Sequence, residues 1–394
     1  MNLKNGLNFR GIVVWTLVVF GAGMSILEIS TRADAWTALF SNSSLTVDSD
    51  LIVKPGPGAF ADGPLARRAI ERAYTKEVRV QLNHLLTVKR EDIRRSISLS
   101  SRYVKHMEPV LKQNGLPAEL AYLCIIESGY RSFARSHAGA TGMWQMIRAT
   151  SRRFGLRTDA WEDQRLDFVM STEGAARYFK YLKKRFHDWD LVLAAYNAGE
   201  GRVQAAINRA RRMGLKGDFE DLQLPRETRI YVPAFYASLL VVMEPERYGI
   251  FPDYQPPIDF QEVNVPGGVK LASLEAEFGT PGGVLKALNP SLIKGRVPPN
   301  KAGYSLRVPC SLDTGLALKV VRSLEEVRWI TYRVRKGDTL WDISKRYGVS
   351  AHRIDRTRKM RRPSVIFPGE ILMIPVIRGL ELGKTTNPLK IKES

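Results

Sequence analysis

The stretch AYLCIIESGYRSFARSHAGATGMWQ, residues 121–145, places an acidic side chain, Glu127, directly behind the apolar run Cys-Ile-Ile. Pro117 suits the first turn of a helix, so a helix is predicted over residues 118–126, with Glu127 at its C-terminal end. A helix C-terminus and an apolar setting both disfavour the charged form of a carboxylate. The stretch therefore predicts a raised pKa for Glu127, which is what a general acid needs near neutral pH. The alternative is a surface glutamate that merely ends a helix.

Further motifs follow Glu127 in a fixed order. Ser136 and Gln145 come next at equal intervals, followed by AAYNAGEGRV at 194–203 and ETRIYV at 227–232. In order and spacing these residues resemble the E-S, G-x-x-Q, A-Y-N-A-G and E-T-x-x-Y-V motifs of the family 1 lytic transglycosylases. The resemblance is closest to the membrane-bound group D of that family, whose members also carry C-terminal LysM modules.

The resemblance implies a fold, a substrate and a reaction. The fold is an all-α, goose-lysozyme-like catalytic domain over residues 85–250, where almost every segment also has helical apolar spacing. The substrate is peptidoglycan, cleaved without water between N-acetylmuramic acid and N-acetylglucosamine to leave 1,6-anhydro-muramic ends. Because the motifs supply one acid for this chemistry, Glu127 would be both general acid and general base, assisted by the substrate's own acetamide. Two alternatives stay open: a hydrolysing muramidase of the same fold, which would use a second carboxylate, and a non-enzymatic wall-binding scaffold.

The resemblance also implies supporting roles for polar residues around Glu127. Ser136 would hydrogen-bond the Glu127 region or the acetamide of the reacting sugar. Tyr196 would orient Glu127 or a sugar through its phenol, and Gln145 and Asn197 would anchor the glycan or adjacent loops. The plainer alternatives are that Tyr196 is a buried aromatic residue and that Asn197 caps a helix.

Other positions of the same motifs are expected to shape the cleft. Glu227 and Tyr231 would complete its wall, although Tyr231 could also be an ordinary buried aromatic. Gly139, Gly142 and Gly199 would permit tight turns and close backbone approach rather than take part in chemistry.

No cofactor or metal is expected. The five histidines are scattered without ligand spacing, and His137 is expected at the rim of the site rather than in a proton relay. The two cysteines, Cys124 and Cys310, lie in segments assigned to different domains, so a disulfide framework is not expected. Cys124 is predicted to be a small buried hydrophobic residue.

The C-terminal part contains an internal repeat behind a Pro-rich linker at 251–262. Residues 265–279 match residues 334–348 at a shift of 69, and residues 306–309 match residues 372–375 at a shift of 66. Each copy is predicted to fold as strand, two short helices, strand. The fold class is therefore α+β multidomain, with the all-α catalytic domain followed by two small βααβ modules at 263–312 and 328–376.

The second copy, YRVRKGDTLWDISKRYGVS from Tyr332, resembles the LysM module, a small domain that binds N-acetylglucosamine-containing glycans. Its turn consists of Gly337, Asp338 and Thr339, and one of the last two residues is expected to cap the following helix. The copy departs from the LysM pattern in a basic cluster, which suggests attraction to stem-peptide carboxylates. This cluster consists of Arg353, Arg356, Arg358, Lys359, Arg361 and Arg362.

The first copy has the reverse departure. It keeps Leu288, Asn289 and Pro290 of the LysM pattern but has Val269 and Lys270 in place of the Asp-Thr turn. It resembles a degenerate LysM module, with an unrelated small α/β spacer as the alternative.

The N-terminal residues resemble an export signal. Residues 1–35 combine a positive start, an apolar run and a small-x-small cleavage site, followed by a spacer and leading helix at 36–84. An uncleaved membrane anchor is the alternative, and residues 377–394 are expected to be a flexible tail. The formal charge of +20 indicates a polyanionic partner, with the solubility of an exported protein as the alternative explanation, and export favours peptidoglycan glycan strands over nucleic acid. The expected location is the periplasm or cell envelope, with membrane contact only through an uncleaved signal.

Overall fold

The computed structural model describes residues 62–299, 301, 303–325, 327–351, 354–356 and 365–377. The predicted signal at 1–35, most of the spacer and almost all of the tail lie outside these residues. So do five members of the basic cluster of the second repeat, and nothing is described of the side chain of the sixth, Arg356.

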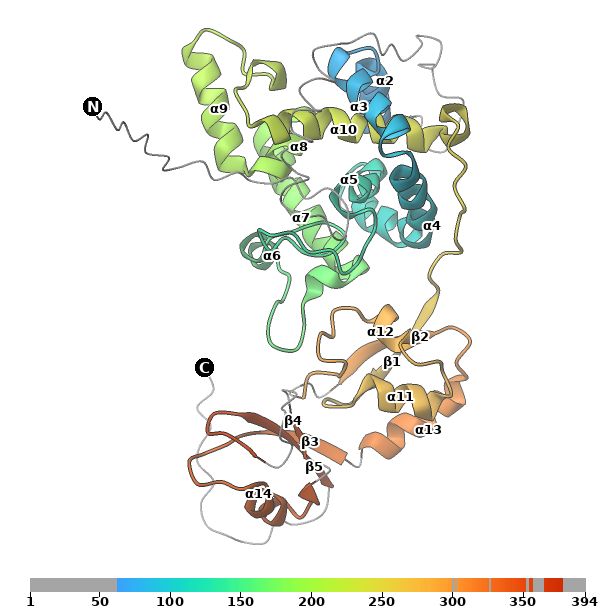
Figure 1. The fold of residues 1–394 in the computed structure, drawn as a ribbon, viewed down its shortest axis with the longest axis vertical. Helices are drawn as coiled ribbons and strands as arrows, with labels where there is room; N and C mark the ends of the chain where they lie inside the picture. The colour runs from blue at the N-terminus through green and yellow to red at the C-terminus, as the bar shows by residue number, and fades with distance from the viewer. Residues whose placement is uncertain are drawn as a thin grey trace, which may run out of the picture.

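The N-terminal half of the described chain is helical (Figure 1). Its α-helices are α2 (Pro64–Arg72), α3 (Lys76–Thr87), α4 (Arg90–Gln113), α5 (Leu123–Ser128), α6 (Arg148–Arg153), α7 (Phe168–Phe186), α8 (Trp189–Ala198), α9 (Glu200–Arg212) and α10 (Arg226–Met243). Its 3₁₀ turns are η2 (Ala118–Tyr122), η3 (Gln164–Leu166), η4 (Phe219–Asp221) and η5 (Pro245–Tyr248). The prediction of an all-α catalytic region is confirmed within the described residues.

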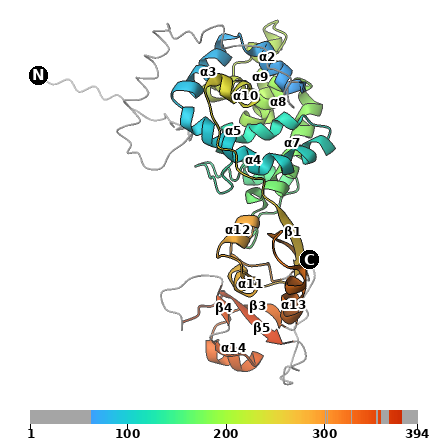
Figure 2. The ribbon, with the colours of Figure 1, turned by 90° about the vertical axis from the view of Figure 1, so that its right-hand side faces the viewer.

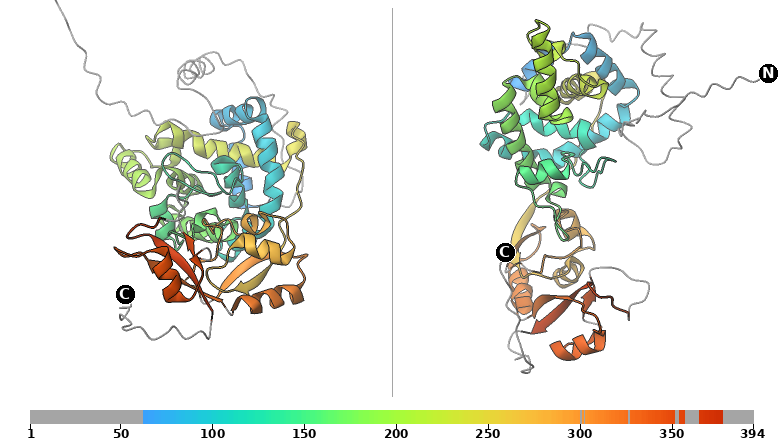
Figure 3. Two further views of the ribbon diagram at one scale, coloured as in Figure 1. Left: turned by 60° about the horizontal axis from the view of Figure 1, so that its bottom comes forward. Right: turned by 90° about the vertical axis from the view of Figure 1, so that its left-hand side faces the viewer.

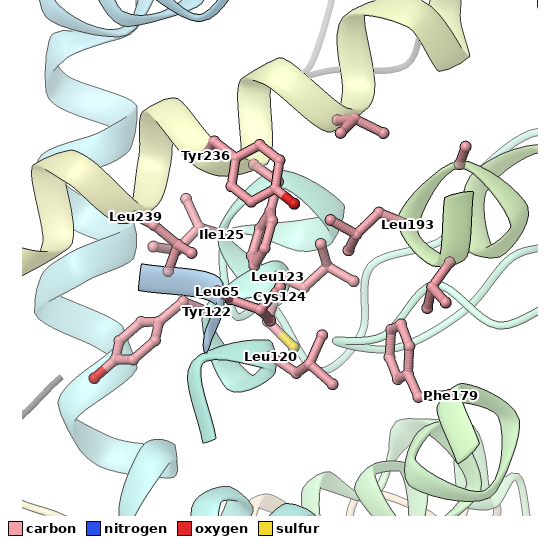
Figure 4. Close-up of a cluster of buried hydrophobic side chains, with 14 of the residues drawn as sticks. Leu65, Leu120, Tyr122, Leu123, Cys124, Ile125, Phe179, Leu193, Tyr236 and Leu239 are labelled. Carbon is pink, nitrogen blue, oxygen red and sulfur yellow. The ribbon is translucent and has the colours of Figure 1, made fainter. Parts of the chain in front are cut away.

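One hydrophobic core holds these helices together, and α10 runs through it. Phe235 and Tyr236 of α10 are fully buried, and Figure 4 shows Tyr236 and Leu239 above the apolar side chains of η2 and α5. The core begins earlier than the predicted boundary at residue 85, because Leu65 of α2 and Leu82 of α3 are also fully buried in it. Helix α3 spans that boundary, so a domain starting at 85 would divide a helix that the core requires.

The Pro-rich segment after the helical half is fixed along α4 rather than standing free. The Asp253 amide donates to the Ser98 hydroxyl at 2.9 Å, and the Ile258 amide donates to the Arg102 carbonyl at 3.1 Å. These bonds satisfy backbone groups of the extended segment. The next strand begins at Phe260, inside the predicted linker.

The first repeat has the predicted order of strand, helix, helix, strand. It consists of β1 (Phe260–Val265), α11 (Leu271–Phe278), α12 (Val284–Leu288) and β2 (Tyr304–Pro309), and β1 pairs antiparallel with β2. A helix that was not predicted, α13 (Thr314–Glu325), packs into the same core through Ala317, Val320 and Val321. The repeat therefore extends beyond residue 312.

The second repeat has its own small core around Ile343, Leu372 and Ile374. It contains β3 (Val327–Arg333), α14 (Leu340–Tyr347), β4 (Asp355–Arg356) and β5 (Ile371–Ile377), with β5 between β3 and β4. The predicted second helix falls partly outside the described residues. Figures 2 and 3 show the helical half at one end of an elongated molecule and the two repeats following it in chain order. Among the described residues, no helix is both long and apolar enough to span a membrane.

Candidate active site

The backbone around Glu127 explains its position at the core surface. The predicted single helix is a 3₁₀ turn, η2, which continues into the short helix α5. Helix α5 ends one residue after Glu127, and Gly129 closes it with a left-handed conformation, φ 59°. The preceding apolar residues Leu123 and Cys124 are fully buried, so they pin α5 to the core while Glu127 stays half-buried at its end.

Helix α10 supplies the hydrogen-bond partner of Glu127. The Tyr231 hydroxyl donates to Glu127 Oε1 across 104 residues of sequence. Burial raises the pKa of Glu127 to about 8, the hydrogen bond from Tyr231 opposes this shift, and the negative charge of Glu227 adds to it. The predicted raised pKa is present, and its main cause is the apolar surroundings. At neutral pH the side chain is therefore mostly protonated.

Tyr196 lies beside the same carboxyl group but bonds elsewhere. Its hydroxyl donates to the Trp144 carbonyl at 2.7 Å, and its ring stacks on Phe179 with centroids 4.5 Å apart. Burial raises the pKa of Tyr196 well above its ordinary value, and the nearby Glu127 adds to that shift. Of the two roles expected of Tyr196, the contact with Glu127 is made by Tyr231 instead, while Tyr196 holds the backbone at Trp144.

Residues 134–146 form what we call the active-site loop. The Gln145 side-chain amide donates to the carbonyls of Gly142, at 2.7 Å, and Ala134, at 3.3 Å, so Gln145 anchors the loop. The Ser136 hydroxyl accepts from the Ala140 amide at 3.1 Å, which closes a turn instead of reaching Glu127.

A buried arginine that the sequence interpretation missed fixes this loop. Arg165 is 2% exposed, and its guanidinium donates to the carbonyls of Gly139, at 2.9 Å, and Met146, at 3.1 Å. Its other face forms a two-bond pair with Asp163, at 2.9 and 2.7 Å. Gly142 has φ +83°, and a Cβ there would lie 1.8 Å from the Arg165 carbonyl oxygen. The close backbone approach expected at Gly142 is thus explained by Arg165, which no motif indicated.

Ser128 is a second residue that the interpretation passed over. It is buried, and its hydroxyl donates to the Met143 carbonyl at 2.9 Å. It therefore ties the residue after Glu127 to the active-site loop, and its place directly behind the acid was the available signal.

The remaining predicted residues lie on α8 and at the start of α10. The Asn197 side-chain oxygen accepts from the Thr228 hydroxyl at 2.8 Å and so joins the two helices. Glu227 is exposed in the first turn of α10, one helical turn before Tyr231. Gly139 and Gly199 have positive φ, as Gly142 does, and His137 is exposed. Six of the polar residues that were predicted for the site are half-buried in the structure. They are Glu127, Ser136, Gln145, Tyr196, Asn197 and Tyr231.

The turn of the second repeat has the expected cap. The Thr339 hydroxyl accepts from the Asp342 amide at 3.1 Å and is the N-cap of α14, while Gly337 has φ +92°. Asp338 instead accepts from the Arg335 amide at 2.7 Å and the Tyr332 hydroxyl at 2.6 Å. Thr339 is therefore the cap, and Asp338 ties the turn to β3.

Neither a metal site nor a disulfide is found in the part of the chain that the structure describes. No group of three or more His, Cys, Asp or Glu side chains is arranged to hold an ion there. Cys124 is fully buried, as expected, with its thiol pKa raised mainly by burial, and Cys310 is exposed.

Comparison with known proteins gives the same picture. Residues 107–217 match the family described as transglycosylase SLT domain, and residues 332–375 match the LysM domain. Membrane-bound lytic murein transglycosylase D of Escherichia coli (strain K12) is 34% identical over 282 residues, which cover 67% of this chain and 61% of that protein. The chain thus spans about three fifths of the length of this relative.

Two shorter matches fall on other proteins. A putative tributyltin chloride resistance protein of Alteromonas sp. (strain M-1) is 39% identical over 107 residues, 27% of this chain and 52% of that protein. The peptidoglycan transglycosylase gp16 of Escherichia phage T7 is 37% identical over 98 residues, 24% of this chain and 7% of that protein. The resemblance inferred from the motifs is confirmed: this chain carries a transglycosylase SLT domain and a LysM domain, and is similar to the membrane-bound lytic murein transglycosylases D.

Proposed function

We propose that this protein is a lytic transglycosylase that cleaves the β-1,4 bond between N-acetylmuramic acid and N-acetylglucosamine in peptidoglycan without water. The observation that carries the proposal is the half-buried Glu127, protonated at neutral pH and held on one oxygen by Tyr231. A general acid is most effective when its pKa lies near the working pH, and this carboxyl group meets that condition.

The geometry supports a reaction with one carboxyl group. Glu127 Oε1 accepts from Tyr231, whereas Oε2 accepts no hydrogen bond from the described residues and is free to carry the proton. That proton would pass to the glycosidic oxygen as the bond to the anomeric carbon breaks, and the acetamide oxygen of the muramic acid would bond to the same carbon. The carboxylate would then take the proton of the sugar's 6-hydroxyl, whose oxygen displaces the acetamide and forms the 1,6-anhydro ring. The acid is regenerated, and no water is consumed.

The hydrolysing muramidase is the second candidate, because one observation favours it. Glu227 is exposed, and its negative charge contributes to the raised pKa of Glu127, so the two side chains lie close enough to interact. In a hydrolase, Glu227 would be the group that activates a water molecule. A water-derived product would carry a reducing end, and it would be heavier than the anhydro product by one water.

Mass spectrometry of the muropeptides released from purified peptidoglycan decides between these reactions. Anhydro-muramic products are expected, with Glu127→Gln at least ~10²-fold slower and still folded. Glu227→Gln is the matched control, since it removes a nearby acid outside the proposed proton path. If the products carry reducing ends and are lost in the Glu227→Gln variant, the enzyme is a hydrolase and not a transglycosylase. Equal activity of the Glu127→Gln variant would refute both.

We further propose an envelope location, with export through residues 1–35 and peptidoglycan strands as the partner. The similarity to proteins named membrane-bound and the LysM domain support this location. Cell fractionation with a C-terminal tag, together with N-terminal sequencing of the mature protein, tests both export and cleavage.

A further inference from the structure

The first repeat is attached to the helical half through the segment 161–167, which lies directly ahead of α7 (Figure 1). The Ile293 amide donates to the Trp161 carbonyl at 3.0 Å, and the Asp163 amide donates to the Ser291 carbonyl at 2.9 Å. The loop after α12 is therefore hydrogen-bonded to the backbone of the helical half, and these backbone groups are not available to a ligand.

A buried ion pair reinforces this contact. Arg307 of β2 donates to Asp167 through two bonds, at 2.8 and 3.2 Å, and the two residues are 6% and 2% exposed. The guanidinium carbon also lies 5.0 Å from the ring centroid of Phe168 and 4.8 Å from that of Phe260. A bidentate arginine between two aromatic rings is held in one geometry, so the repeat has one docked orientation.

The repeat uses its retained LysM-like asparagine to support this arginine. Asn289 is 3% exposed, accepts from the Arg307 amide at 3.0 Å and donates to the Arg307 carbonyl at 2.7 Å. Its remaining donor bonds the Leu285 carbonyl at 2.9 Å. Because these bonds occupy the amide, Asn289 holds β2 in place and has no side-chain donor left for a sugar.

Two chains of contacts run from the docked repeat toward Glu127. In the first, Asp163 pairs with Arg165, which bonds the Gly139 and Met146 carbonyls at the two ends of the turn in the active-site loop. That loop in turn receives the hydroxyl of Ser128, the neighbour of Glu127, at the Met143 carbonyl.

In the second chain, Asp167 caps α7 by accepting from the Val169 and Met170 amides. Helix α7 then presents Thr172, which accepts from the Trp144 indole at 2.9 Å. The Trp144 carbonyl is the acceptor of the Tyr196 hydroxyl. Both series of contacts therefore end in the active-site loop.

We propose that the first repeat is a docked brace that positions the active-site loop, with Arg307 as its positioning residue, rather than a free glycan-binding module. The activity part of this inference rests on the proposed function, whereas the structural part does not. Once the Arg307–Asp167 pair is broken, the segment 161–167 keeps only its backbone bonds to the repeat, so Arg165 holds the active-site loop less firmly.

The test compares Arg307→Gln with Glu262→Gln in the full chain. Glu262 faces the same guanidinium at 3.9 Å, but it lies on β1 of the repeat itself and is 51% exposed, so its removal leaves the docking bonds intact. Hydrogen exchange should accelerate on the order of ten-fold at amides of 134–146 and 161–167 in Arg307→Gln, and should not change in Glu262→Gln. On peptidoglycan, kcat should fall on the order of ten-fold with little change in KM, because positioning is lost while the binding surface remains.

Asp167→Asn serves as the second variant if Arg307→Gln does not fold, because asparagine keeps the cap of α7 while it weakens the pair. Faster exchange confined to 161–167, with the active-site loop unchanged, would overturn the coupling. Faster exchange throughout the helical core would also overturn it, since that result means general destabilisation. The exchange measurement needs no substrate, so a chain that shows the loop response without any transglycosylase activity would refute the proposed function and leave the brace standing.

Discussion

The hydrogen bond from Tyr231 makes a prediction about the pH dependence of the enzyme. In Tyr231→Phe the carboxylate of Glu127 loses its described donor, so the charged form is less stable and the pKa must rise above about 8. A hydrogen bond to an ionised group contributes about 1.5–3 kcal/mol, and one pKa unit corresponds to about 1.4 kcal/mol. Because the phenol also bonds the neutral carboxyl group, roughly half of that energy separates the two protonation states, which gives a shift of about half a unit to one unit.

The assay is the pH profile of kcat/KM on solubilised peptidoglycan strands. The reaction needs protonated Glu127, so activity falls as pH rises through the pKa, and this alkaline limb should move up by about half a unit to one unit in Tyr231→Phe. Tyr196→Phe is the matched control: its hydroxyl bonds the Trp144 carbonyl, so it should lower kcat without moving the limb. Carbon-13 NMR of labelled glutamate, assigned with Glu127→Gln, gives the same pKa without turnover. A limb that stays in place or moves down would refute the assignment of Tyr231 as the group that stabilises the carboxylate.

Three further predictions concern stability. The pKa of Glu127 in the folded protein, about 8, lies above the reference value of 4.5. As pH rises between these values, the free energy of unfolding of the wild type should therefore fall relative to that of Glu127→Gln. The loss is at most about 5 kcal/mol by urea unfolding, and parallel curves would contradict the raised pKa. Asp190→Ala removes the buried carboxylate of α8 that pairs with Arg68 and Arg72 of α2, and it should cost about 3 kcal/mol, although Glu71 and Glu220 still pair with the two arginines. Glu71→Ala, at an exposed pair, should cost less than about 1 kcal/mol, and equal costs would refute a larger contribution from the buried pairs. In Gly142→Ala the added Cβ would overlap the Arg165 carbonyl oxygen, so the active-site loop cannot keep its place beside Arg165 and the free energy of unfolding should fall. Gly139→Ala has the same sign of φ but open space around it, and it should cost about 1 kcal/mol in thermal unfolding. Equal losses of stability would show that the positive φ, and not the close approach, matters.

The repeats show which parts of the fold the local sequence pattern can predict. The shift of 69 residues places Leu271, Leu274 and Phe278 in α11 and their counterparts Leu340, Ile343 and Tyr347 in α14, and each repeat has its own core. Helix α13 was not predicted, because it lies outside the repeated pattern and is specified by packing of Ala317 and Val320 against the first repeat.

Within the site, the sequence by itself determined the acid and its setting. An apolar run that ends in a carboxylate at a helix end predicts a raised pKa, because the apolar side chains that enter the core carry the neighbouring carboxyl group toward it. The resemblance to the lytic transglycosylases likewise predicted that Tyr231, Tyr196, Gln145 and Gly142 belong to the site. The contact with Glu127 was predicted for Tyr196, but the structure gives it to Tyr231, while Tyr196 bonds the Trp144 carbonyl.

Only the tertiary structure decided which side chains meet. Tyr231 reaches Glu127 from 104 residues away, and Arg165 reaches the active-site loop from a 3₁₀ turn that has no motif. Arg307 reaches Asp167 across 140 residues and joins two units that the sequence treated as separate. Periodicity and spacing report which face of an element is apolar, but the partner of a buried polar group depends on how the elements pack. Pairs of this kind therefore cannot be assigned from one sequence, because burial makes each of them necessary only after the chain has folded.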